Sequence, residues 1–127
     1  MKLTESQWRE RLTEEEFKVC REKGTERPFT GHLLDSRAAG DYVCTCCEKK
    51  LFTSEDKFDS GCGWPSFFSQ STEQNVEYHS DNSLGMLRIE IVCRHCDAHL
   101  GHVFDDGPPP TGKRYCVNSV AVKFKPT

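Results

Sequence analysis

Four cysteines stand in two pairs whose spacing is typical of a metal site. Two residues separate Cys44 from Cys47, and two separate Cys93 from Cys96. This spacing lets one tight turn present both sulfurs to a single ion at about 2.3 Å, and two such turns complete a tetrahedron. Because a closed shell of four thiolates leaves no position for water or substrate, we expect one structural zinc ion.

Three other interpretations of the paired cysteines are open at this stage. An iron–sulfur cluster also uses four thiolates. In a zinc site, His95 or His99 could replace one of the cysteines. The pairs could also be two redox dithiols, although neither lies between a strand and a helix. Cys46 lies within the first pair and has no partner at the same spacing, so we expect its thiol to point away from the metal.

Cys116 lies near the start of a segment with alternating side chains, and its neighbours could activate it. Period-two geometry puts Arg114, Cys116 and Asn118 on one side of an extended chain. A nearby cation favours the thiolate, which is the nucleophilic form of cysteine. The same face continues in apolar residues to Phe124, so Cys116 could be a core residue, but Arg114 and Asn118 would then be buried polar groups. We therefore predict a nucleophile at the end of the core.

Cys62 lies between Gly61 and Gly63, directly before Trp64 and Pro65. Glycine on both sides gives the backbone freedom and leaves space around the sulfur, which suits a thiol that moves to meet another. Trp64 offers an aromatic face that contacts sulfur and methyl groups well, although a tryptophan here could instead pack in the core. This segment is the second candidate for thiol chemistry.

His99 and His102 follow the second cysteine pair and stand three residues apart. A helical or tight turn would bring the two rings together. Neutral histidine both donates and accepts a hydrogen bond near pH 7, which qualifies both residues as donors or acids in a cleft. Cys20, by contrast, falls on the apolar face of an expected helix and is predicted to pack as a small hydrophobic residue.

Length and composition limit the kind of protein that carries these residues. Eight cysteines among 127 residues, about 6%, lie below the roughly 8–10% of disulfide scaffolds, so the thiols are better explained as ligands, nucleophiles or core residues. The chain has no signal-like start and no stretch of the ~18 apolar residues that span a membrane, so we expect a cytoplasmic location and no membrane partner. The net charge of −3 counts against a nucleic-acid partner.

Residues 1–24 are expected to form two short helices. Each begins with the capping-box pattern, in which a hydroxyl residue stands three positions before a glutamine or glutamate. These pairs are Thr4 with Gln7 and Thr13 with Glu16. The second helix is predicted to end at Gly24, a favourable C-terminal residue, and Phe17 and Cys20 would form its inner face.

From residue 27 onward, glycine and proline punctuate short segments rich in β-forming residues. The predicted strands are 41–46, 50–54, 66–70, 76–80, 86–93, 102–105 and 114–124. Several short strands with frequent turns favour a mainly β fold of two antiparallel sheets, packed as a sandwich or a rolled sheet. No βαβ spacing is visible. The length of 127 residues implies one domain, so we expect a single domain over 1–127, with a helical segment at 1–24 and a β core at 27–125.

Three longer segments resemble the signatures of one enzyme family. They are FDSGCGWPSF at 58–67, CRHCDAHLGHVF at 93–104 and RYCVNS at 114–119. These strings are similar to those of the B-type methionine sulfoxide reductases, and the resemblance extends over about residues 5–125. It implies reduction of the R epimer of methionine sulfoxide, mainly in oxidised proteins, with thioredoxin as the reductant and repair of oxidative damage as the role.

The resemblance also implies a mainly β fold and roles for individual residues. Cys116 would be the nucleophile and Cys62 the resolving thiol. The zinc ligands would be Cys44, Cys47, Cys93 and Cys96. The substrate pocket would contain Trp64, His99, His102, Arg114 and Asn118. Cys20 and Cys46 do not belong to the family pattern.

The chemistry of this family fits the residues. The thiolate of Cys116 would attack the sulfoxide sulfur while His99 or His102 protonates the oxygen, directly or through water. Trp64 would hold the S-methyl group, and the other polar pocket residues would stabilise the developing oxyanion. Cys116 would become a sulfenic acid and condense with Cys62 to a disulfide, which an external dithiol reduces.

A zinc-ribbon module that binds protein or nucleic acid is the alternative from another functional class. Such a module would present a basic or apolar exposed patch and would tolerate Cys116→Ser. The acidic balance of the chain disfavours it. A zinc nucleobase deaminase would need a His-x-Glu motif before a cysteine pair and an open metal position, and the sequence contains no such motif.

Overall fold

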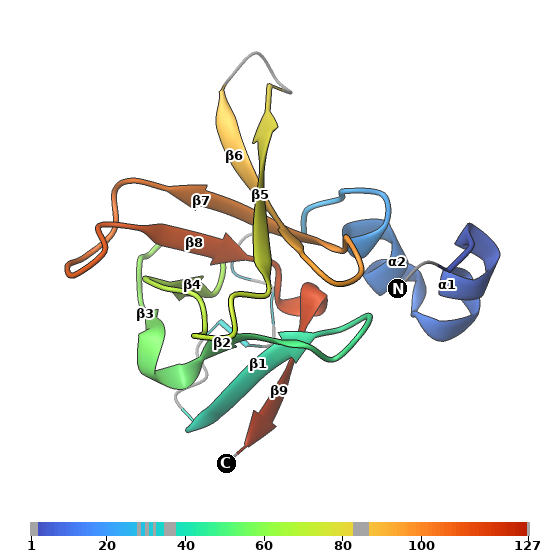
Figure 1. Cartoon of the computed structure of the whole chain (residues 1–127), viewed down its shortest axis with the longest axis horizontal. Helices are drawn as coiled ribbons and strands as arrows, with labels where there is room; N and C mark the ends of the chain where they lie inside the picture. The colour runs from blue at the N-terminus through green and yellow to red at the C-terminus, as the bar shows by residue number, and fades with distance from the viewer. Residues whose placement is uncertain are drawn as a thin grey trace.

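Two antiparallel β-sheets form most of the computed structural model, which describes residues 3–27, 29, 31, 33, 34, 38–82 and 87–126. The smaller sheet has the strand order β2-β1-β9, and the larger has the order β3-β4-β8-β7-β6-β5 (Figure 1). The elements are α1 (Glu5–Arg11), α2 (Glu14–Cys20), β1 (Gly40–Cys44), β2 (Lys50–Thr53), η1 (Ser54–Asp56), β3 (Lys57–Phe58), β4 (Ser66–Phe67), β5 (Val76–Asp81), β6 (Arg88–Cys93), β7 (His99–Phe104), β8 (Arg114–Val117), η3 (Ser119–Ala121) and β9 (Val122–Pro126). The predicted mainly β fold with two antiparallel sheets is confirmed.

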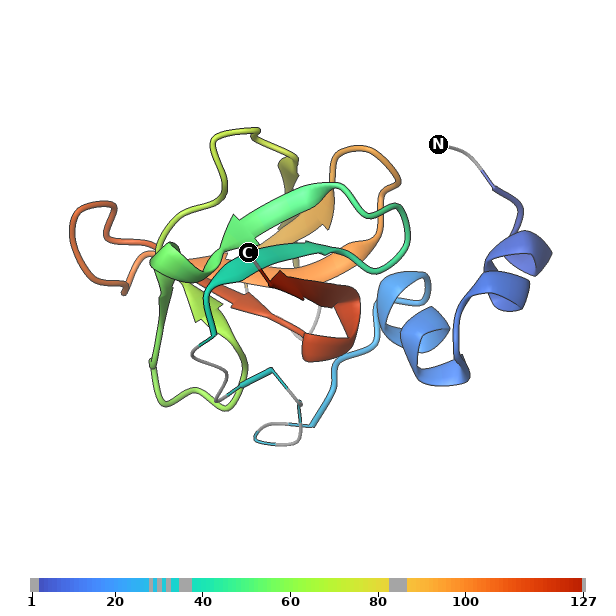
Figure 2. The same cartoon turned by 90° about the horizontal axis from the view of Figure 1, so that it is seen from below.

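Helices α1 and α2 begin with the predicted capping boxes. The hydroxyl of Thr4 accepts a hydrogen bond from the N–H of Gln7, and the side chain of Gln7 accepts one from the N–H of Thr4. Thr13 and Glu16 repeat the arrangement at the start of α2. Both helices lie beside the two sheets rather than between them (Figures 1 and 2).

Helix α2 ends at Cys20, earlier than the predicted end at Gly24. Lys23 has a positive φ of 58°, and the N–H of Gly24 donates to the carbonyl of Lys18 at 2.9 Å. The chain therefore leaves the helix before it reaches the glycine, through a residue in the left-handed region. Phe17 and Cys20 are buried, as predicted for the inner face.

The predicted strand 114–124 is wrong as a single strand. β8 ends at Val117 and pairs with β4 and β7, whereas β9 begins at Val122 and pairs with β1 in the other sheet. At the crossing, the backbone N–H and the side-chain amide of Asn118 both donate to the carbonyl of Leu100, at 3.0 and 3.1 Å. Apolar alternation continues through the crossing because both sheets face the same core, so the pattern alone does not reveal the break.

Strand β7 begins at His99, earlier than the predicted start at residue 102. Its pairing with β6 shifts register between Ile91 and Val92, where β7 carries one extra residue, Leu100. This extra residue is a β-bulge, which changes the side of the sheet on which the following side chains lie.

The other predicted strands have the right place and the wrong length. The predicted strand 41–46 ends at Cys44, because the chain then turns. Of the predicted strand 66–70, only the first two residues form a strand, β4. The predicted strand 86–93 corresponds to β6, which begins at Arg88; its predicted first residue, Met86, lies outside the described residues. The predicted strands 50–54 and 76–80 each differ by one residue at the C-terminal end from the observed β2 and β5. The short β3 was not predicted.

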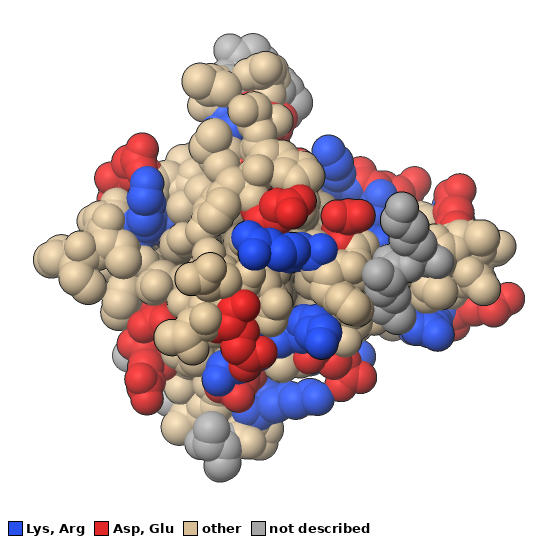
Figure 3. All heavy atoms as spheres, in the orientation of Figure 1, with Lys and Arg blue, Asp and Glu red and all other residues tan. Residues whose placement is uncertain are grey.

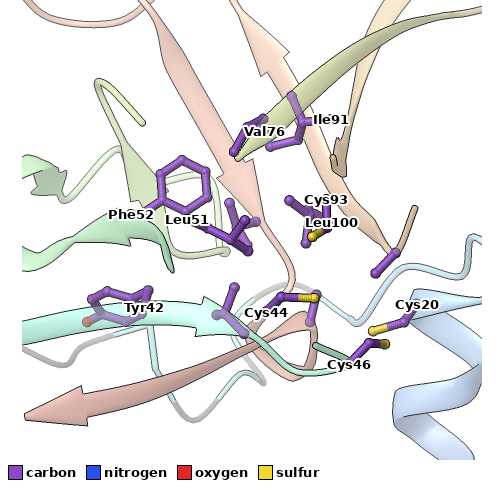
Figure 4. Packing of buried hydrophobic residues seen from close by; sticks show 14 of the residues in the cluster. Cys20, Tyr42, Cys44, Cys46, Leu51, Phe52, Val76, Ile91, Cys93 and Leu100 are labelled. Atoms are coloured by element: carbon purple, nitrogen blue, oxygen red, sulfur yellow. The ribbon is translucent and has the colours of Figure 1, made fainter. Parts of the chain in front are cut away.

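The hydrophobic core lies between the two sheets. The ring of Phe52 from the smaller sheet stacks on Phe67 from the larger sheet, with ring centroids 4.4 Å apart. Tyr42 meets the same Phe67 ring edge-on at 5.0 Å. Figure 4 shows this core continuing through Leu100 toward the cysteine at the end of β1, Cys44. Burial of apolar rings from both sheets holds the sheets together.

The surface carries charges of both signs. On the face in Figure 3, acidic and basic side chains are interspersed. Some surface charges form ion pairs, such as that between Lys125 and Glu48 at 2.7 Å. Among the residues that the structure describes, no helix has the length and apolar character that crossing a membrane requires.

Candidate active site and metal centre

The four paired cysteines meet in one cluster. The Sγ atoms of Cys44, Cys47, Cys93 and Cys96 all lie within 4.8 Å of one another. The Sγ–Sγ distance is 3.6 Å between Cys44 and Cys96 and 3.5 Å between Cys47 and Cys93. In a tetrahedron with metal–sulfur bonds of about 2.3 Å, the sulfurs are about 3.8 Å apart. The cluster therefore has the size that a single ion with four thiolates requires.

Two turns of the same form present these cysteines. Cys44 ends β1 and Cys93 ends β6. The carbonyl of each accepts a hydrogen bond at 2.8 Å, from the N–H of Glu48 in the first turn and of Asp97 in the second. Glu48 and Asp97 also share a positive φ, 65° and 63°. The repeated spacing in the sequence thus corresponds to a repeated backbone turn.

The geometry separates the alternatives for these cysteines. His95 is exposed and His99 pairs with Glu90, so neither histidine is in the cluster. Cys46 lies outside the cluster and is buried in the core, as is Cys20. The four sulfurs are spaced as ligands of one ion, closer together than a cluster of several iron atoms would need, and the two cysteine pairs form one cluster rather than two separate dithiols.

Arg21 connects the helical segment to the metal centre. Its Nη2 donates to the carbonyl of Cys96 at 2.9 Å, and its guanidinium lies 4.5 Å from the centre of the Trp8 ring. The hydrogen bond and the cation–π contact join α1, α2 and the second cysteine turn.

Cys62 and Cys116 are brought together with their Sγ atoms 3.2 Å apart. Cys116 lies in β8 opposite Ser66 of β4, and Cys62 lies in the loop before β4. Gly61 and Gly63 in this loop have positive φ angles of 73° and 92°. L side chains rarely adopt such angles, so the shape of the loop requires the two glycines.

Hydrogen bonds and burial act differently on the two thiols. Burial would raise the pKa of Cys62, but hydrogen bonds with Ser60, Ser66 and Cys116 lower this pKa to about 7. Burial raises the pKa of Cys116 to about 12, and the hydrogen bond and the charge of Cys62 add to the increase. Of the two thiols, Cys62 is therefore the one that loses its proton first, near neutral pH.

Arg114 lies directly against Cys116. Its Nη1 donates to the Cys116 Sγ at 2.8 Å. This cation lowers the pKa of Cys116, as the sequence predicted, but does not outweigh the burial. Nε and Nη2 donate to the two carboxylate oxygens of Asp106 at 2.8 and 3.1 Å, and the guanidinium lies 4.4 Å from the centre of the Phe104 ring. Asp106 and Phe104, which no local pattern predicted, therefore hold the cation in place.

A cavity of about 330 Å³ opens beside the thiol pair. Six of the residues predicted for the site line it, namely Cys62, Trp64, His102, Arg114, Cys116 and Asn118. Thr25, Arg88 and Phe104 also line it and were not predicted. His99 is not among the lining residues, although the family resemblance predicted it for the substrate pocket. The cavity thus brings together the predicted thiols, cation and aromatic ring in one place.

The two histidines lie side by side, but only His102 lines this cavity. A regular strand would put His99 and His102 on opposite sides, whereas the bulge at Leu100 puts their rings 5.7 Å apart. His99 pairs with Glu90, and His102 pairs with Asp81, each at 2.7 Å. Burial lowers the pKa of His99 against the opposing effect of Glu90. The predicted proximity of the rings is therefore correct, but the predicted turn is wrong.

The backbone of Glu26 fixes two further cavity residues. Its carbonyl accepts a hydrogen bond from Nε1 of Trp64, and its N–H donates to Oδ1 of Asn118, both at 2.9 Å. Trp64 is only partly buried. It is therefore a wall of the cavity rather than a core residue, and Glu26 is a contact that only the folded chain reveals.

Comparisons with known proteins show the family to which this chain belongs. Residues 12–126 match the family model described as the SelR domain. The chain is 59% identical over 123 residues to the peptide methionine sulfoxide reductase MsrB of Alteromonas mediterranea, an alignment that covers 97% of this chain and 87% of that protein. It is 56% identical over 124 residues to the protein of the same name from Hahella chejuensis, covering 98% and 89% of the two chains. This chain therefore belongs to the SelR-domain family of MsrB peptide methionine sulfoxide reductases.

Proposed function

We propose that this chain reduces the R epimer of methionine sulfoxide to methionine, mainly in oxidised proteins, and so repairs oxidative damage. Membership of the MsrB family supports methionine sulfoxide reduction. The observation that carries the finer proposal is the 3.2 Å contact between the Sγ atoms of Cys62 and Cys116. This contact lies at a cavity that also contains a cation and an aromatic wall.

Cys116 is the nucleophile of the proposed reaction. Transfer of the Cys116 proton to the Cys62 thiolate, 3.2 Å away, leaves a thiolate on Cys116. The hydrogen bond from Nη1 of Arg114 stabilises this thiolate. The thiolate attacks the sulfoxide sulfur, and His102, which lines the cavity, protonates the oxygen. The ring of His99 lies 5.7 Å from the ring of His102, centre to centre, and does not line the cavity.

Cys62 is the resolving thiol. When the sulfur–oxygen bond of the substrate breaks, methionine leaves and Cys116 carries a sulfenic acid. Cys62 then attacks the sulfenic sulfur, water leaves, and a Cys62–Cys116 disulfide forms. Since the sulfurs are already 3.2 Å apart, a bond of about 2.05 Å needs only a small movement of the glycine-flanked loop. Thioredoxin reduces this disulfide in the final step.

Trp64, Asn118 and Arg114 complete the substrate pocket. The aromatic face of Trp64 would hold the S-methyl group and help to select the epimer. Its ring nitrogen is already bonded to Glu26, so the orientation of this wall is set before substrate binds. Arg114 and the polar groups of Asn118 and His102 favour the charge that develops on the oxygen.

We assign a structural zinc ion to the cluster of Cys44, Cys47, Cys93 and Cys96. The fit of the four sulfurs to one ion supports this assignment. Cys44 ends a strand of the smaller sheet and Cys93 ends a strand of the larger one. A bound ion would therefore join the two sheets, and its contribution would be to stability rather than to the reaction.

We propose that the chain is one reductase domain over residues 1–127, with a helical segment at 1–24 and a β core at 27–125. The SelR match over residues 12–126 supports one domain. The thiol chemistry needs free cysteines and a dithiol reductant, and both are maintained in a reducing cytoplasm. We therefore propose a cytoplasmic location and no nucleic-acid partner.

An epimer-resolved assay on peptide-bound methionine R- and S-sulfoxide tests the proposed function. We expect the wild-type protein with thioredoxin to reduce the R epimer and to leave the S epimer unchanged. Cys116→Ser should reduce neither epimer, whereas Cys20→Ser, which changes a buried thiol outside the site, should keep the activity. Reduction of the R epimer by Cys116→Ser would refute the assigned nucleophile.

A further inference from the structure

One carboxylate, that of Asp81, holds two of the residues that line the substrate cavity. Its Oδ2 accepts a hydrogen bond from Nε2 of His102 at 2.7 Å and another from Nη2 of Arg88 at 3.3 Å. His102 and Arg88 both line the cavity of about 330 Å³, whereas Asp81 does not. Asp81 therefore contacts two side chains that can meet a substrate, but is not itself part of the cavity wall.

The register of neighbouring strands puts these side chains on one face of the larger sheet. β6 lies between β5 and β7 (Figure 1). Asp81 of β5 pairs with Arg88 of β6, and Glu90 of β6 pairs with His102 of β7. Arg88 and Glu90 are two residues apart, so their side chains point to the same side of β6, and residues that pair across strands share a side. The contact between Asp81 and His102 therefore rests on the sheet rather than on a loop.

A second pair of a histidine and a carboxylate on β5 differs from this one in its exposure. Oε1 of Glu77 lies 2.8 Å from Nε2 of His79, and the two side chains are 42% and 46% exposed. The side chains of Asp81 and His102 are 20% and 13% exposed. Water competes with an exposed pair and weakens it more than a pair that is withdrawn from solvent. We therefore expect Asp81, but not Glu77, to fix the orientation of its histidine ring.

The bond to Asp81 decides which nitrogen of His102 remains for the substrate. The carboxylate also pairs with the Arg88 cation and only accepts hydrogen bonds, so Nε2 of His102 carries a proton. Nδ1 is the ring nitrogen that is left. In the neutral ring this nitrogen is an acceptor, whereas in the imidazolium it carries a proton and can donate to a sulfoxide oxygen.

We propose that Asp81 is a positioning residue for the reaction, which holds His102 so that the ring donates its proton from Nδ1 while Nε2–H stays bonded to the carboxylate. This inference rests on the function proposed above, in which His102 protonates the sulfoxide oxygen. As Cys116 attacks the sulfur, the Nδ1 proton passes to the oxygen and the imidazolium becomes the neutral ring. A proton from water then restores the imidazolium. The carboxylate neither gains nor loses a proton, as in the Ser-His-Asp triad.

Asp81→Ala tests the proposal, with Glu77→Ala as the matched control. Each variant removes from β5 a carboxylate that bonds Nε2 of a histidine. In the first turnover with peptide-bound methionine R-sulfoxide, Asp81→Ala should lower the maximal rate of methionine formation about 10- to 100-fold. The substrate concentration that gives half of this rate should change little, because Asp81 does not line the cavity. Glu77→Ala should keep the wild-type rate. Equal rates for the two variants would overturn the proposal.

A double-mutant cycle separates positioning from a general loss of structure. If Asp81 acts through His102, then adding Asp81→Ala to His102→Gln should slow the reaction by no more than about twofold. A further loss as large as that of Asp81→Ala alone would overturn the proposal, and so would a wild-type rate in His102→Gln. If Asp81→Ala does not fold, Asp81→Ser keeps a polar side chain that is shorter, and the same results are expected.

Nuclear magnetic resonance of isotope-labelled histidine tests the hydrogen bond without the reaction. The wild-type protein and Glu77→Ala should show a slowly exchanging proton on Nε2 of His102, which His102→Gln identifies by its loss, and Asp81→Ala should lose the same signal. Persistence of this signal in Asp81→Ala would overturn the proposal. A wild-type protein that shows the signal but forms no methionine would contradict the proposed function and leave the contact with Asp81 established.

Discussion

The metal centre and the Cys62–Cys116 pair are both groups of close thiols, but their surroundings differ. In the metal centre, four sulfurs lie within 4.8 Å of one another at the ends of two turns, and Arg21 contacts one of them, the Sγ of Cys96, at 3.9 Å. In the reactive pair, two sulfurs 3.2 Å apart contact hydroxyl groups and a guanidinium beside a cavity. In the function that we propose, the cation, the hydrogen-bond donors and the adjacent cavity, rather than the presence of close thiols alone, make the second group the reactive one.

Loss of the metal centre should have the largest effect on the folded state. Because a bound ion would join the two sheets, Cys93→Ser should lower the free energy of unfolding by more than about 3 kcal/mol. Thermal unfolding with and without a chelator measures this effect, together with metal analysis for zinc. Cys46→Ser, which changes a buried thiol outside the cluster, should have a much smaller effect. Unchanged unfolding in chelator would contradict a structural ion.

Removal of the cation should affect the reactive pair and leave the metal centre intact. Arg114→Gln should slow formation of the first methionine about 100-fold, because the Cys116 thiolate and the developing oxyanion lose a charged donor. Rapid-quench measurement of methionine gives this rate. Arg11→Gln removes an exposed cation on α1 and should leave the rate unchanged. Equal rates for the two variants would show that the cation is not needed.

The pH dependence of the reactive pair should follow the Cys62 pKa of about 7. Methionine formation should be slow at lower pH, where both thiols are protonated, and should rise as pH increases through this value. Ser60→Ala removes a hydroxyl that donates to Cys62, so it should move the midpoint upward by up to about one pH unit. Ultraviolet absorbance of the thiolate measures the midpoint. Ser69→Ala serves as a control, and a downward shift in Ser60→Ala would contradict the account.

The smallest expected effect is at the helical segment that contacts the metal centre. Thr13→Ala removes the hydroxyl that accepts from the N–H of Glu16, and should lower the free energy of unfolding by about 1 kcal/mol without changing methionine formation. Denaturant unfolding gives the value. An exposed threonine outside any helix cap, Thr72, provides the matched control as Thr72→Ala. A larger loss in the control would exclude the capping explanation.

Local patterns predicted the features that depend on local geometry. The spacing of Cys44 and Cys47 corresponds to a single backbone turn, and the same holds for Cys93 and Cys96. The capping box at Thr13 also involves only the residues of one turn. In such cases the sequence separation of the residues already fixes their approximate distance in space.

Features that depend on contacts between distant segments could not be predicted in this way. The bulge at Leu100, which places the two histidine rings together, appears only in the pairing of β6 with β7. Asp106 contacts Arg114 only because β7 and β8 pair, and Glu26 contacts Trp64 and Asn118 only in the folded chain. The crossing between sheets at Asn118 was missed because apolar alternation continues through it.

Mass spectrometry of Cys62→Ser tests the central claim. This claim is that Cys116 accepts the sulfoxide oxygen as a sulfenic acid, and that Cys62 converts the sulfenic acid into a disulfide. With excess peptide-bound methionine R-sulfoxide and thioredoxin, this variant should form about one methionine per protein molecule and then stop, with one added oxygen on the peptide that contains Cys116. Undiminished turnover with thioredoxin, or the added oxygen on another cysteine, would contradict the account.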